Sequence, residues 1–452
     1  MNIRAVPHSQ GKDGRTLTSS LDLLVLGMCT GTGLGYLDCA LVRFSQTSPS
    51  TPLREQLQQF DRIPVPVSIK TPIVDSFRND RRNSESTTQP NQLLSRLFSG
   101  GIETFCRKHA LEPSSIDLVG MHSDALWHLK AASDVEGEQG HPLQWISLMT
   151  AETGISTVFD FKITERAVVR PHIHPTTYVN RVFLRHPTKF RVYLDIDEIT
   201  NLSFIPPHGD NGARPTISQD CGPGSLLIDY AMRYCTSNNQ SDDHDGDLGA
   251  LGKINQKIVD QFLKSHDYLR KTPSMSIATE MFGNHEAQQL IDECLYNGMS
   301  EADTIATITR ATAQNILNQY NRLLKLCFPP DQHVDELFIC GPGAHNTNII
   351  DYLESKLPES VITKPLHDIG IPGDAHEAVC YAHLALEAVL NQITQTTDPA
   401  TLDAVSAKVV PGQRWDDLRS HVLGFSGGRK VHVPTDVRIV GSLEAAVQRM
   451  TI

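Results

Sequence analysis

The sequence predicts an α/β protein with two lobes, and three observations support that prediction. The chain has 452 residues, more than one ordinary hydrophobic core organises. Apolar runs of strand length come first along the chain, and runs with helical periodicity dominate later. Three glycine-rich turns, at 31–35, 222–224 and 341–343, each lie beside an apolar run. Such turns at strand ends favour a ligand held in a cleft between the lobes.

Composition and charge narrow the class of protein. The chain is 39% hydrophobic with a formal net charge of −12, so we expect neither a nucleic-acid partner nor an anionic membrane as partner. Its nine cysteines include no Cys-x-x-Cys pair, which is typical of reduced thiols in the cytoplasm. No apolar run approaches the length that spans a bilayer. We therefore expect a cytoplasmic location.

Shifts in composition suggest where the parts of the chain begin. Residues 1–20 are polar and lack the apolar core of a secretory signal, so we expect a flexible tail. A mitochondrial presequence is the alternative, which Asp13 and the absence of an amphipathic pattern disfavour. We expect an N-terminal lobe at 21–185, a C-terminal lobe at 186–395, and a segment at 396–452 that returns to the body.

The first expected element is a hairpin. The apolar run 21–27, the turn 31–35 and the apolar run 37–44 follow one another without a helix. That order argues against a dinucleotide fingerprint, which must open a helix. Glycines let successive amides converge on an anion, which is how sugar kinases and actin-like ATPases hold nucleotide phosphates. A purely structural hairpin is an equal alternative.

Later elements alternate in type. Further strands are expected at 65–69, 118–122, 157–161, 191–196, 226–228 and 337–340. Helices are expected at 92–109, 250–265, 286–297, 301–326, 347–356 and 375–393. Polar stretches at 78–91, 208–218 and 236–247 predict surface loops.

The second and third glycine turns have different neighbours along the chain. Asp220-Cys221-Gly222-Pro223-Gly224-Ser225 precedes a short apolar run. Cys340-Gly341-Pro342-Gly343-Ala344-His345-Asn346 comes after an apolar run and precedes a helical pattern. Each turn fits a tight connection as well as it fits a ligand-binding loop.

Five blocks of the chain resemble the anhydro-N-acetylmuramic acid kinases, members of the sugar kinase and actin superfamily. One nearly reproduces the family's Asp-Thr-Gly-Pro-Gly-Asn-x-Leu-Ile-Asp, and another its Cys-Gly-Gly-Gly-Ala-His-Asn with Pro342 for one glycine. The blocks occur in the family's order, which makes the resemblance specific. They are Gly120–His128, Arg191–Leu202, Asp220–Asp229, Cys340–Asn346 and Asp374–Ala378.

The resemblance implies a two-lobed actin-like sugar kinase fold, with duplicated ribonuclease-H-like lobes around a cleft. It implies ATP-dependent chemistry on a 1,6-anhydro amino sugar, in which water opens the ring and O6 takes the phosphoryl group. Mg²⁺ bridges the phosphates in that chemistry. The implied partners are the nucleotide and the amino sugar, and family members commonly pair as homodimers.

The resemblance also assigns site residues. Glu165 stands at the position of the general base, and Asp38 at that of a magnesium ligand. The residues implied for the sugar are His122, Asn201 and Glu280. Those implied for the nucleotide are Gly31, Thr32, Gly33, Asp38, Asp220, Gly222, Gly224, Gly341, Gly343 and Asn346.

Several positions depart from the family's pattern. Gly35 and Tyr36 stand where the family has aspartate and glycine, and Glu165 is one methylene longer than the family's aspartate. The pair 197–198 is Asp-Glu in place of Gly-Gly, and 274–282 lacks both basic residues of its block. Carboxylates beside a polyphosphate repel it. A second hypothesis is therefore a catalytically degenerate relative that binds a sugar, a regulator or a protein partner.

Overall fold

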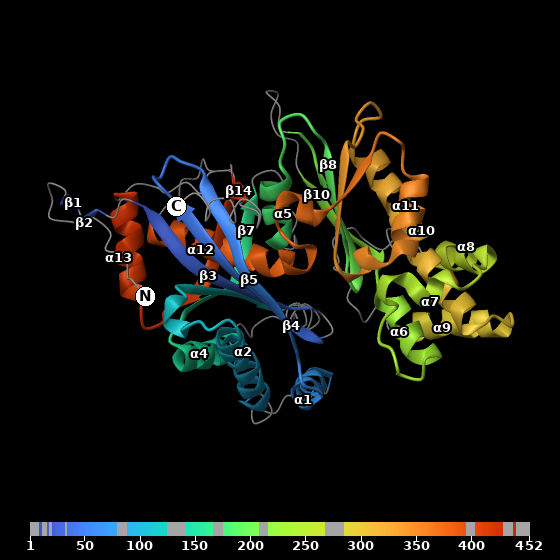
Figure 1. The fold of residues 1–452 in the computed structure, drawn as a ribbon, viewed down its shortest axis with the longest axis horizontal. Helices are drawn as coiled ribbons and strands as arrows, with labels where there is room; N and C mark the ends of the chain where they lie inside the picture. Colours follow the sequence, from blue (N-terminus) through green and yellow to red (C-terminus); the bar gives the residue numbers. More distant parts are fainter. Residues whose placement is uncertain are drawn as a thin grey trace. The chain divides into compact units, whose positions relative to one another are not determined.

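The computed structural model describes eleven stretches of the chain, which separate into two compact units. The first unit comprises 1–169, 369–371 and 375–452, and the second comprises 170–368 and 372–374. Figure 1 draws the described stretches in colour. They are residues 9–10, 16–17, 20–31, 34–78, 88–123, 141–165, 175–207, 216–266, 284–394, 403–427 and 437–439.

A mixed sheet forms the centre of the first unit. Its strand order is β13-β7-β6-β3-β4-β5-β14, in which β3, β4 and β5 are antiparallel neighbours and β3, β6 and β7 are parallel. A separate ladder joins β1 (Ser9–Gln10) to β2 (Thr16–Leu17). The sheet strands are β3 (Leu21–Thr30), β4 (Tyr36–Gln46), β5 (Leu53–Pro64), β6 (Leu118–Ser123), β7 (Ser156–Glu165), β13 (Asp403–Val410) and β14 (Val437–Ile439).

Helices cover both faces of this sheet (Figure 1). On one face, α12 approaches so closely that a Cβ atom at Gly27 would lie 1.8 Å from the carbonyl oxygen of Ala378. On the other face, α2 and α4 bury Phe98 against Trp145, with ring centroids 5.1 Å apart. The helices are α1 (Val67–Arg78), α2 (Thr88–Lys108), α4 (His141–Thr153), α12 (His376–Ile393) and α13 (Trp415–Ser426), with a 3-10 turn η2 (Pro113–Ser115).

The second unit has its own mixed sheet, in the order β10-β9-β8-β11-β12. Strands β8, β9 and β10 form an antiparallel meander, and β11 lies parallel to both β8 and β12. The strands are β8 (Arg191–Ile196), β9 (Ile199–Ile205), β10 (Ile217–Pro223), β11 (Glu336–Cys340) and β12 (Ile362–Pro365).

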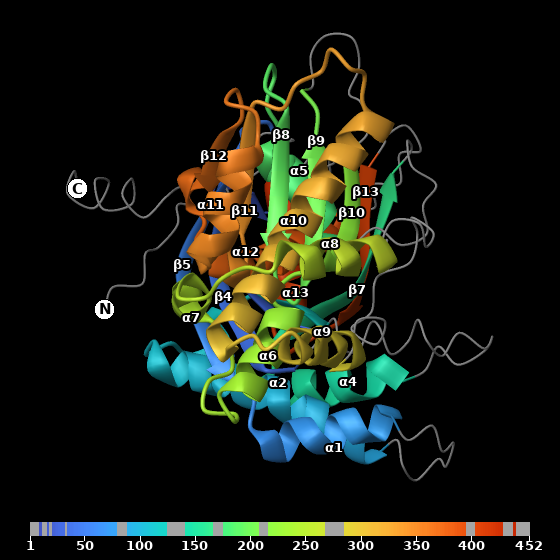
Figure 2. The ribbon, with the colours of Figure 1, turned by 90° about the vertical axis from the view of Figure 1, so that its right-hand side faces the viewer.

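One face of this second sheet packs into a hydrophobic core. Leu194, Leu202 and Phe204 enter the hydrophobic core, to which α10 contributes Ile308 and Ile316. Figure 2 looks onto α10 as it crosses the sheet. The helices are α5 (Pro175–Leu184), α6 (Leu226–Cys235), α7 (Asp247–Ala250), α8 (Gln256–Ser265), α9 (Asn284–Tyr296), α10 (Glu301–Cys327) and α11 (Thr347–Lys356), with 3-10 turns η3 (His244–Gly246), η4 (Pro342–His345), η5 (Leu366–Ile369) and η6 (Gly373–Ala375).

A buried carboxylate ties three strands of this sheet together. Glu336 at the start of β11 lies 2.7 Å from both Arg191 and Lys364 and 2.5 Å from Lys189. Burial alone would raise the pKa of Glu336, but the hydrogen bonds from these three cations lower it to about 2. The carboxylate is therefore ionised throughout the neutral pH range.

The two-lobed α/β class predicted from the sequence is confirmed, and so are most of its helices. Two expected strands are wrong. Residues 65–69 follow the end of β5 and include the start of α1, because Pro64 and Pro66 lack the N–H that a continuing strand must donate. Residues 226–228 open α6, whose buried positions 227, 228, 231 and 232 follow helical spacing. The helix expected at 250–265 begins only at Gln256.

Candidate functional site

Four residues of the first unit stand in one row across four strands. Asp38 on β4 is opposite Arg62 on β5 and Cys29 on β3, and Cys29 is opposite His122 on β6. Residues opposite one another in a sheet project to the same face. The row lies next to the glycine turn, which the hydrogen bond from the Leu34 amide to the Gly31 carbonyl closes at 3.2 Å.

Asp38 is engaged by a cation of the protein itself. Arg62 donates from Nε and from Nη2 to the two carboxylate oxygens of Asp38, at 2.8 Å each. The guanidinium carbon also lies 5.6 Å from the ring centre of Tyr36. Charge-assisted bidentate pairs are among the stronger polar contacts of proteins. The carboxylate expected to bind magnesium thus holds an arginine.

Two histidines of this unit are packed as core residues. His122 stacks on Tyr381 with ring centroids 4.8 Å apart, and Tyr381 stacks on Phe161. His376 is buried in the first turn of α12, and burial lowers its pKa to about 3. His122 was expected to contact the sugar, and in the structure it is buried with its ring stacked on Tyr381.

Strand β7 carries a strained residue near the expected base. Asp160 has a φ of 57°, a conformation that costs a residue other than glycine free energy, and its carboxylate lies 2.7 Å from Lys408 Nζ. Glu165 ends β7 opposite Asp403, and its side chain lies outside the described residues. The same holds for three other expected site residues, Thr32, Gly33 and Glu280.

The second unit has a corresponding polar row at the ends of its strands. Asp220 on β10 is opposite Asn201 on β9, Asn201 is opposite Asp195 on β8, and Asp195 is opposite Cys340 on β11. Asn201 donates from Nδ2 to Asp220 at 2.9 Å. Two expected site residues, Asn201 and Asp220, are therefore in direct contact, and Asp195 joins their row.

Hydrogen bonds fix the orientation of the Asn201 amide. Its oxygen accepts from the hydroxyls of Ser203 at 3.0 Å and Ser218 at 3.1 Å, on the same face of the sheet. Because the hydroxyls hold the oxygen, the nitrogen must face Asp220. The Asn201 side chain is therefore held in one orientation.

The second glycine turn is bound tightly to the 197–198 turn. The amides of Gly224 and Ser225 donate to the carbonyls of Glu198 and Asp197 at 2.9 and 2.8 Å. A Cβ at Gly224 would lie 2.1 Å from the Asp197 carbonyl oxygen, so no other residue fits there. These two amides serve the loop itself, and Gly222, with φ 114°, makes the turn possible.

The third glycine turn packs against the end of β8. Gly341 has φ 84°, and a Cβ there would lie 2.5 Å from Asp195 Oδ1. A Cβ at Gly343 would lie 2.3 Å from the Ile196 side chain. Asn346 caps α11 by accepting from the Asn348 amide at 3.2 Å. The turn thus packs its two glycines directly against Asp195 and Ile196.

Asp229, which was not expected as a site residue, titrates near neutral pH. Burial raises the pKa of Asp229 to about 7, and the hydrogen bond from the Ser225 hydroxyl at 2.8 Å offsets part of that rise. The block Asp220–Asp229 had marked it in the sequence. Arg62 had no such marker, because it lies in a polar run that gave no strand signal.

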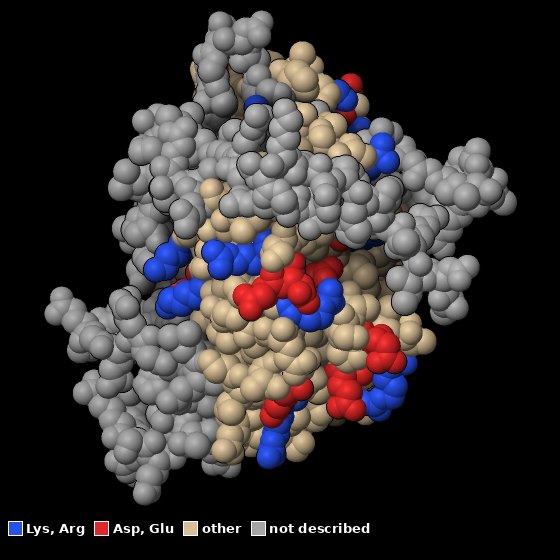
Figure 3. Space-filling view, turned by 90° about the vertical axis from the view of Figure 1, so that its left-hand side faces the viewer, with Lys and Arg blue, Asp and Glu red and all other residues tan. Residues whose placement is uncertain are grey.

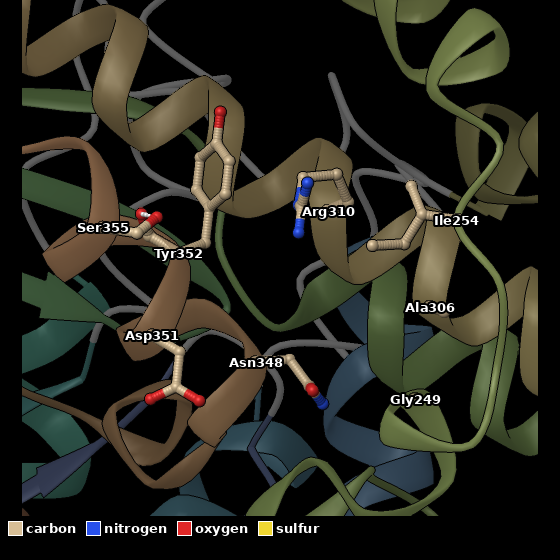
Figure 4. A pocket seen from close by; sticks show the side chains of 8 residues that line it. All are labelled: Gly249, Ile254, Ala306, Arg310, Asn348, Asp351, Tyr352 and Ser355. Carbon is tan, nitrogen blue, oxygen red and sulfur yellow. Dashed lines mark hydrogen bonds between the residues drawn. The ribbon is translucent and has the colours of Figure 1, made fainter.

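A small cavity lies between α7, α10 and α11 of the second unit. Its volume is about 230 Å³, and Arg310, Asn348, Asp351 and Tyr352 are among its lining residues. Figure 4 shows Arg310 and Tyr352 facing each other from two helices, and the guanidinium carbon lies 4.2 Å from the ring centre. None of the residues expected for the sugar or nucleotide lines this cavity.

Magnesium does not fit the Asp38 carboxylate as the structure has it. Mg²⁺ takes oxygen ligands at about 2.1 Å in octahedral geometry. With Arg62 in place the ion would lie about 4 Å from the guanidinium, where at an effective dielectric constant of about 20 the repulsion is about 8 kcal/mol. No group of three or more His, Cys, Asp or Glu residues in the described part of the chain could hold a metal ion.

Surface charge and hydropathy add two observations. On the face in Figure 3, Lys and Arg side chains stand beside Asp and Glu, so neither sign dominates the described surface there. Within the residues that the structure describes, no helix is both long and apolar enough to cross a membrane.

Solved structures and curated relatives resemble this chain over most of its length. A ROK family glucokinase from Streptomyces griseus, in complex with glucose and AMPPNP, aligns with a TM-score of 0.34 and 12% identity, over 80% of this chain and 99% of that one. An anhydro-N-acetylmuramic acid kinase of Caldanaerobacter subterraneus is 28% identical over 83% of this chain and 93% of its own. An anhydro-N-acetylmuramic acid kinase of Crocosphaera subtropica is 26% identical over 81% of this chain and 93% of its own.

The family model described as anhydro-N-acetylmuramic acid kinase matches residues 23–410, which include both polar rows and all three glycine turns. The chain belongs to the anhydro-N-acetylmuramic acid kinase family.

Proposed function

We propose that this protein is an ATP-dependent kinase that opens a 1,6-anhydro amino sugar, anhydro-N-acetylmuramic acid, with water and phosphorylates its O6. The observation that carries the proposal is the family match over 23–410, which takes in the polar rows at the strand ends of both units. The partners under this proposal are the nucleotide, the amino sugar and a second copy of the chain. All nine cysteines are thiols, which supports a reducing, cytoplasmic location.

The chemistry needs a base, a phosphoryl donor and a held sugar. Glu165 would take a proton from the water as the water oxygen bonds to C1 and the C1–O6 bond breaks. ATP supplies the γ-phosphoryl group, which O6 accepts as ADP leaves. Asp195 and Asn201 would orient the ligand, since hydrogen bonds already hold their row in place.

The first glycine turn supports the same proposal because its backbone at Gly35 is not covered by side chains. Gly35 has nothing within 4 Å of the place where a Cβ would stand, whereas Gly341 and Gly343 are packed against Asp195 and Ile196. Open backbone of this kind lets phosphate groups approach closely. The proposal places the nucleotide against the 31–35 turn and, on the family match, against the turns that contain Gly222 and Gly341.

A second candidate function is sugar or partner binding without turnover. Two contacts favour it: Arg62 occupies both oxygens of Asp38, and the amides of Gly224 and Ser225 are used by the neighbouring turn. The first binds Asp38 to a cation of the protein in place of magnesium, and the second removes two amides that could donate to a phosphate. The two candidates differ in whether a phosphorylated sugar is made.

The deciding experiment incubates the purified chain with ATP, Mg²⁺ and anhydro-N-acetylmuramic acid and follows the sugar by mass spectrometry. The kinase proposal expects Glu165→Gln to lower kcat by about 100-fold or more. Glu152→Gln, an exposed carboxylate on α4, is the matched control and should leave kcat unchanged. Absence of product with sugar binding intact would favour the second candidate.

A further inference from the structure

A partly buried ion pair stands beside the first glycine turn. Asp38 and Arg62 face each other directly across β4 and β5, two residues from Tyr36, where β4 begins. The Asp38 side chain is 15% exposed and that of Arg62 is 34% exposed. The strands fix the position of both backbones, so the pair is a built feature of the sheet.

The geometry of the pair engages both oxygens of the carboxylate. Nε and Nη2 of Arg62 each lie 2.8 Å from a different oxygen of Asp38, which matches the planar fork of a guanidinium to a carboxylate. The Tyr36 ring supports the guanidinium at 5.6 Å. A metal ion that approached these oxygens with the arginine in place would be repelled by the guanidinium.

The next carboxylate along β5 cannot assist Asp38. Asp61 is opposite Cys39 and therefore projects to the other face of the sheet. There it lies 2.7 Å from His109 Nε2 and also contacts Lys108. Asp61 is consequently not placed to share a divalent ion with Asp38.

We propose that Arg62 closes the Asp38 carboxylate to divalent cations, so that the first hairpin of this chain presents an arginine–aspartate pair in place of a metal-bound carboxylate. Arg62 is then a specificity-determining residue for the cation. Only the consequence for nucleotides rests on the proposed function: the nucleotide brings its metal ion to the protein without a bond to Asp38.

The test uses the nucleotide-free protein and terbium(III), a hard cation that binds carboxylates and emits when a nearby tyrosine is excited. Tyr36 lies close enough to the pair to serve as that tyrosine. The proteins compared are the wild type, Asp38→Asn, Arg62→Gln and the double variant. Tyr36→Phe in the Arg62→Gln background identifies the signal that comes from this hairpin.

The wild type and Asp38→Asn are expected to give the same terbium titration. Arg62→Gln should raise the tyrosine-sensitised emission by about threefold, and Asp38→Asn in that background should abolish the gain. Emission from the wild type that falls with Asp38→Asn would overturn the proposal. So would an Arg62→Gln protein that is folded and gains nothing.

Two further measurements keep the test decisive. Should Arg62→Gln not fold, Arg62→Lys keeps the positive charge without the fork and should show a smaller gain, whereas no gain would count against the proposal. Calorimetric titration with AMPPNP, with Mg²⁺ or with EDTA, gives the nucleotide consequence. The Mg²⁺ effect on affinity should be unchanged by Asp38→Asn. A chain that binds no nucleotide contradicts the proposed function and leaves the terbium result standing.

Discussion

Replacing Glu55 by Gln tests how the first unit holds α12 against its sheet. Glu55 on β5 and His383 on α12 are each 1% exposed, and their Oε2 and Nδ1 atoms lie 2.9 Å apart. Glu387 lies 3.5 Å from the other nitrogen of the imidazole. Breaking a buried charge pair costs about 3–5 kcal/mol, and because Glu387 remains, we expect the low end, about 3 kcal/mol.

That free energy predicts a large change in melting temperature. For a unit of about 250 residues, each kcal/mol lowers the midpoint by about 2–4 °C, so Glu55→Gln should melt about 6–12 °C below the wild type. Differential scanning calorimetry is the assay, because it can separate the transitions of two units. Glu103→Gln, whose side chain is 76% exposed beside Arg107, is the control and should shift the midpoint by less than about 2 °C.

The same cluster predicts a pH dependence. Burial lowers the pKa of His383, but Glu55 and Glu387 outweigh it and raise the pKa to about 10, above the ordinary 6.5. The stabilisation is therefore full below pH 6.5 and is lost as the pH rises towards 10. The melting temperature of the wild type should exceed that of His383→Gln by most at pH 6 and by least at pH 10. The reasoning would be refuted if the Glu55→Gln midpoint lay within about 2 °C of that of the wild type. It would also be refuted if the difference in melting temperature between the wild type and His383→Gln did not change with pH.

Three other predictions concern the second unit and the glycine turns. Gly224→Ala should weaken AMPPNP binding by about tenfold in calorimetry, because the added Cβ would lie 2.1 Å from the Asp197 carbonyl oxygen. Gly100→Ala, whose Cβ would have nothing within 4 Å, is the control and should leave the affinity unchanged. Equal effects of the two variants would count against the turn as a nucleotide loop. Asp229→Asn should raise the melting temperature at pH 8 and leave it unchanged at pH 4. The reason is that a pKa raised to about 7 means that the ionised carboxylate destabilises the fold. The same change in melting temperature at both pH values would contradict this. Asn346→Ala should cost about 1 kcal/mol in urea unfolding through loss of the α11 cap, and a neutral result would contradict that role.

Periodicity predicted the helices well because packing and pattern agree. The run 301–326 has one apolar stripe and a capping box at Ser300 and Asp303, and α10 spans Glu301–Cys327. Strand β5 was missed because Leu53–Pro64 is mostly polar, and only Leu53 and Glu55 are buried in it. A strand that is paired on both edges can still expose many side chains, and no alternation then marks it.

Sequence comparison had singled out four residues of the two polar rows, while the contacts within the rows required coordinates. The four are Asp38, His122, Asn201 and Asp220. Asn201 and Asp220 are 19 residues apart in the chain and meet because β9 and β10 are antiparallel. The pairing of Asp38 with Arg62 likewise depends on the register of β4 and β5. Spacing along one chain carries no information about such cross-strand contacts, so the arginine was not foreseen.

The most direct test of the central claim is the mass of the sugar after incubation with ATP. If the chain phosphorylates the substrate of its family, the mass of anhydro-N-acetylmuramic acid should increase by one water and one phosphoryl group together. ADP should accumulate in an equal amount. The account would be contradicted if the protein bound the sugar but both the sugar and the ATP remained unchanged. The chain would then be a binding protein that retains the fold of a kinase.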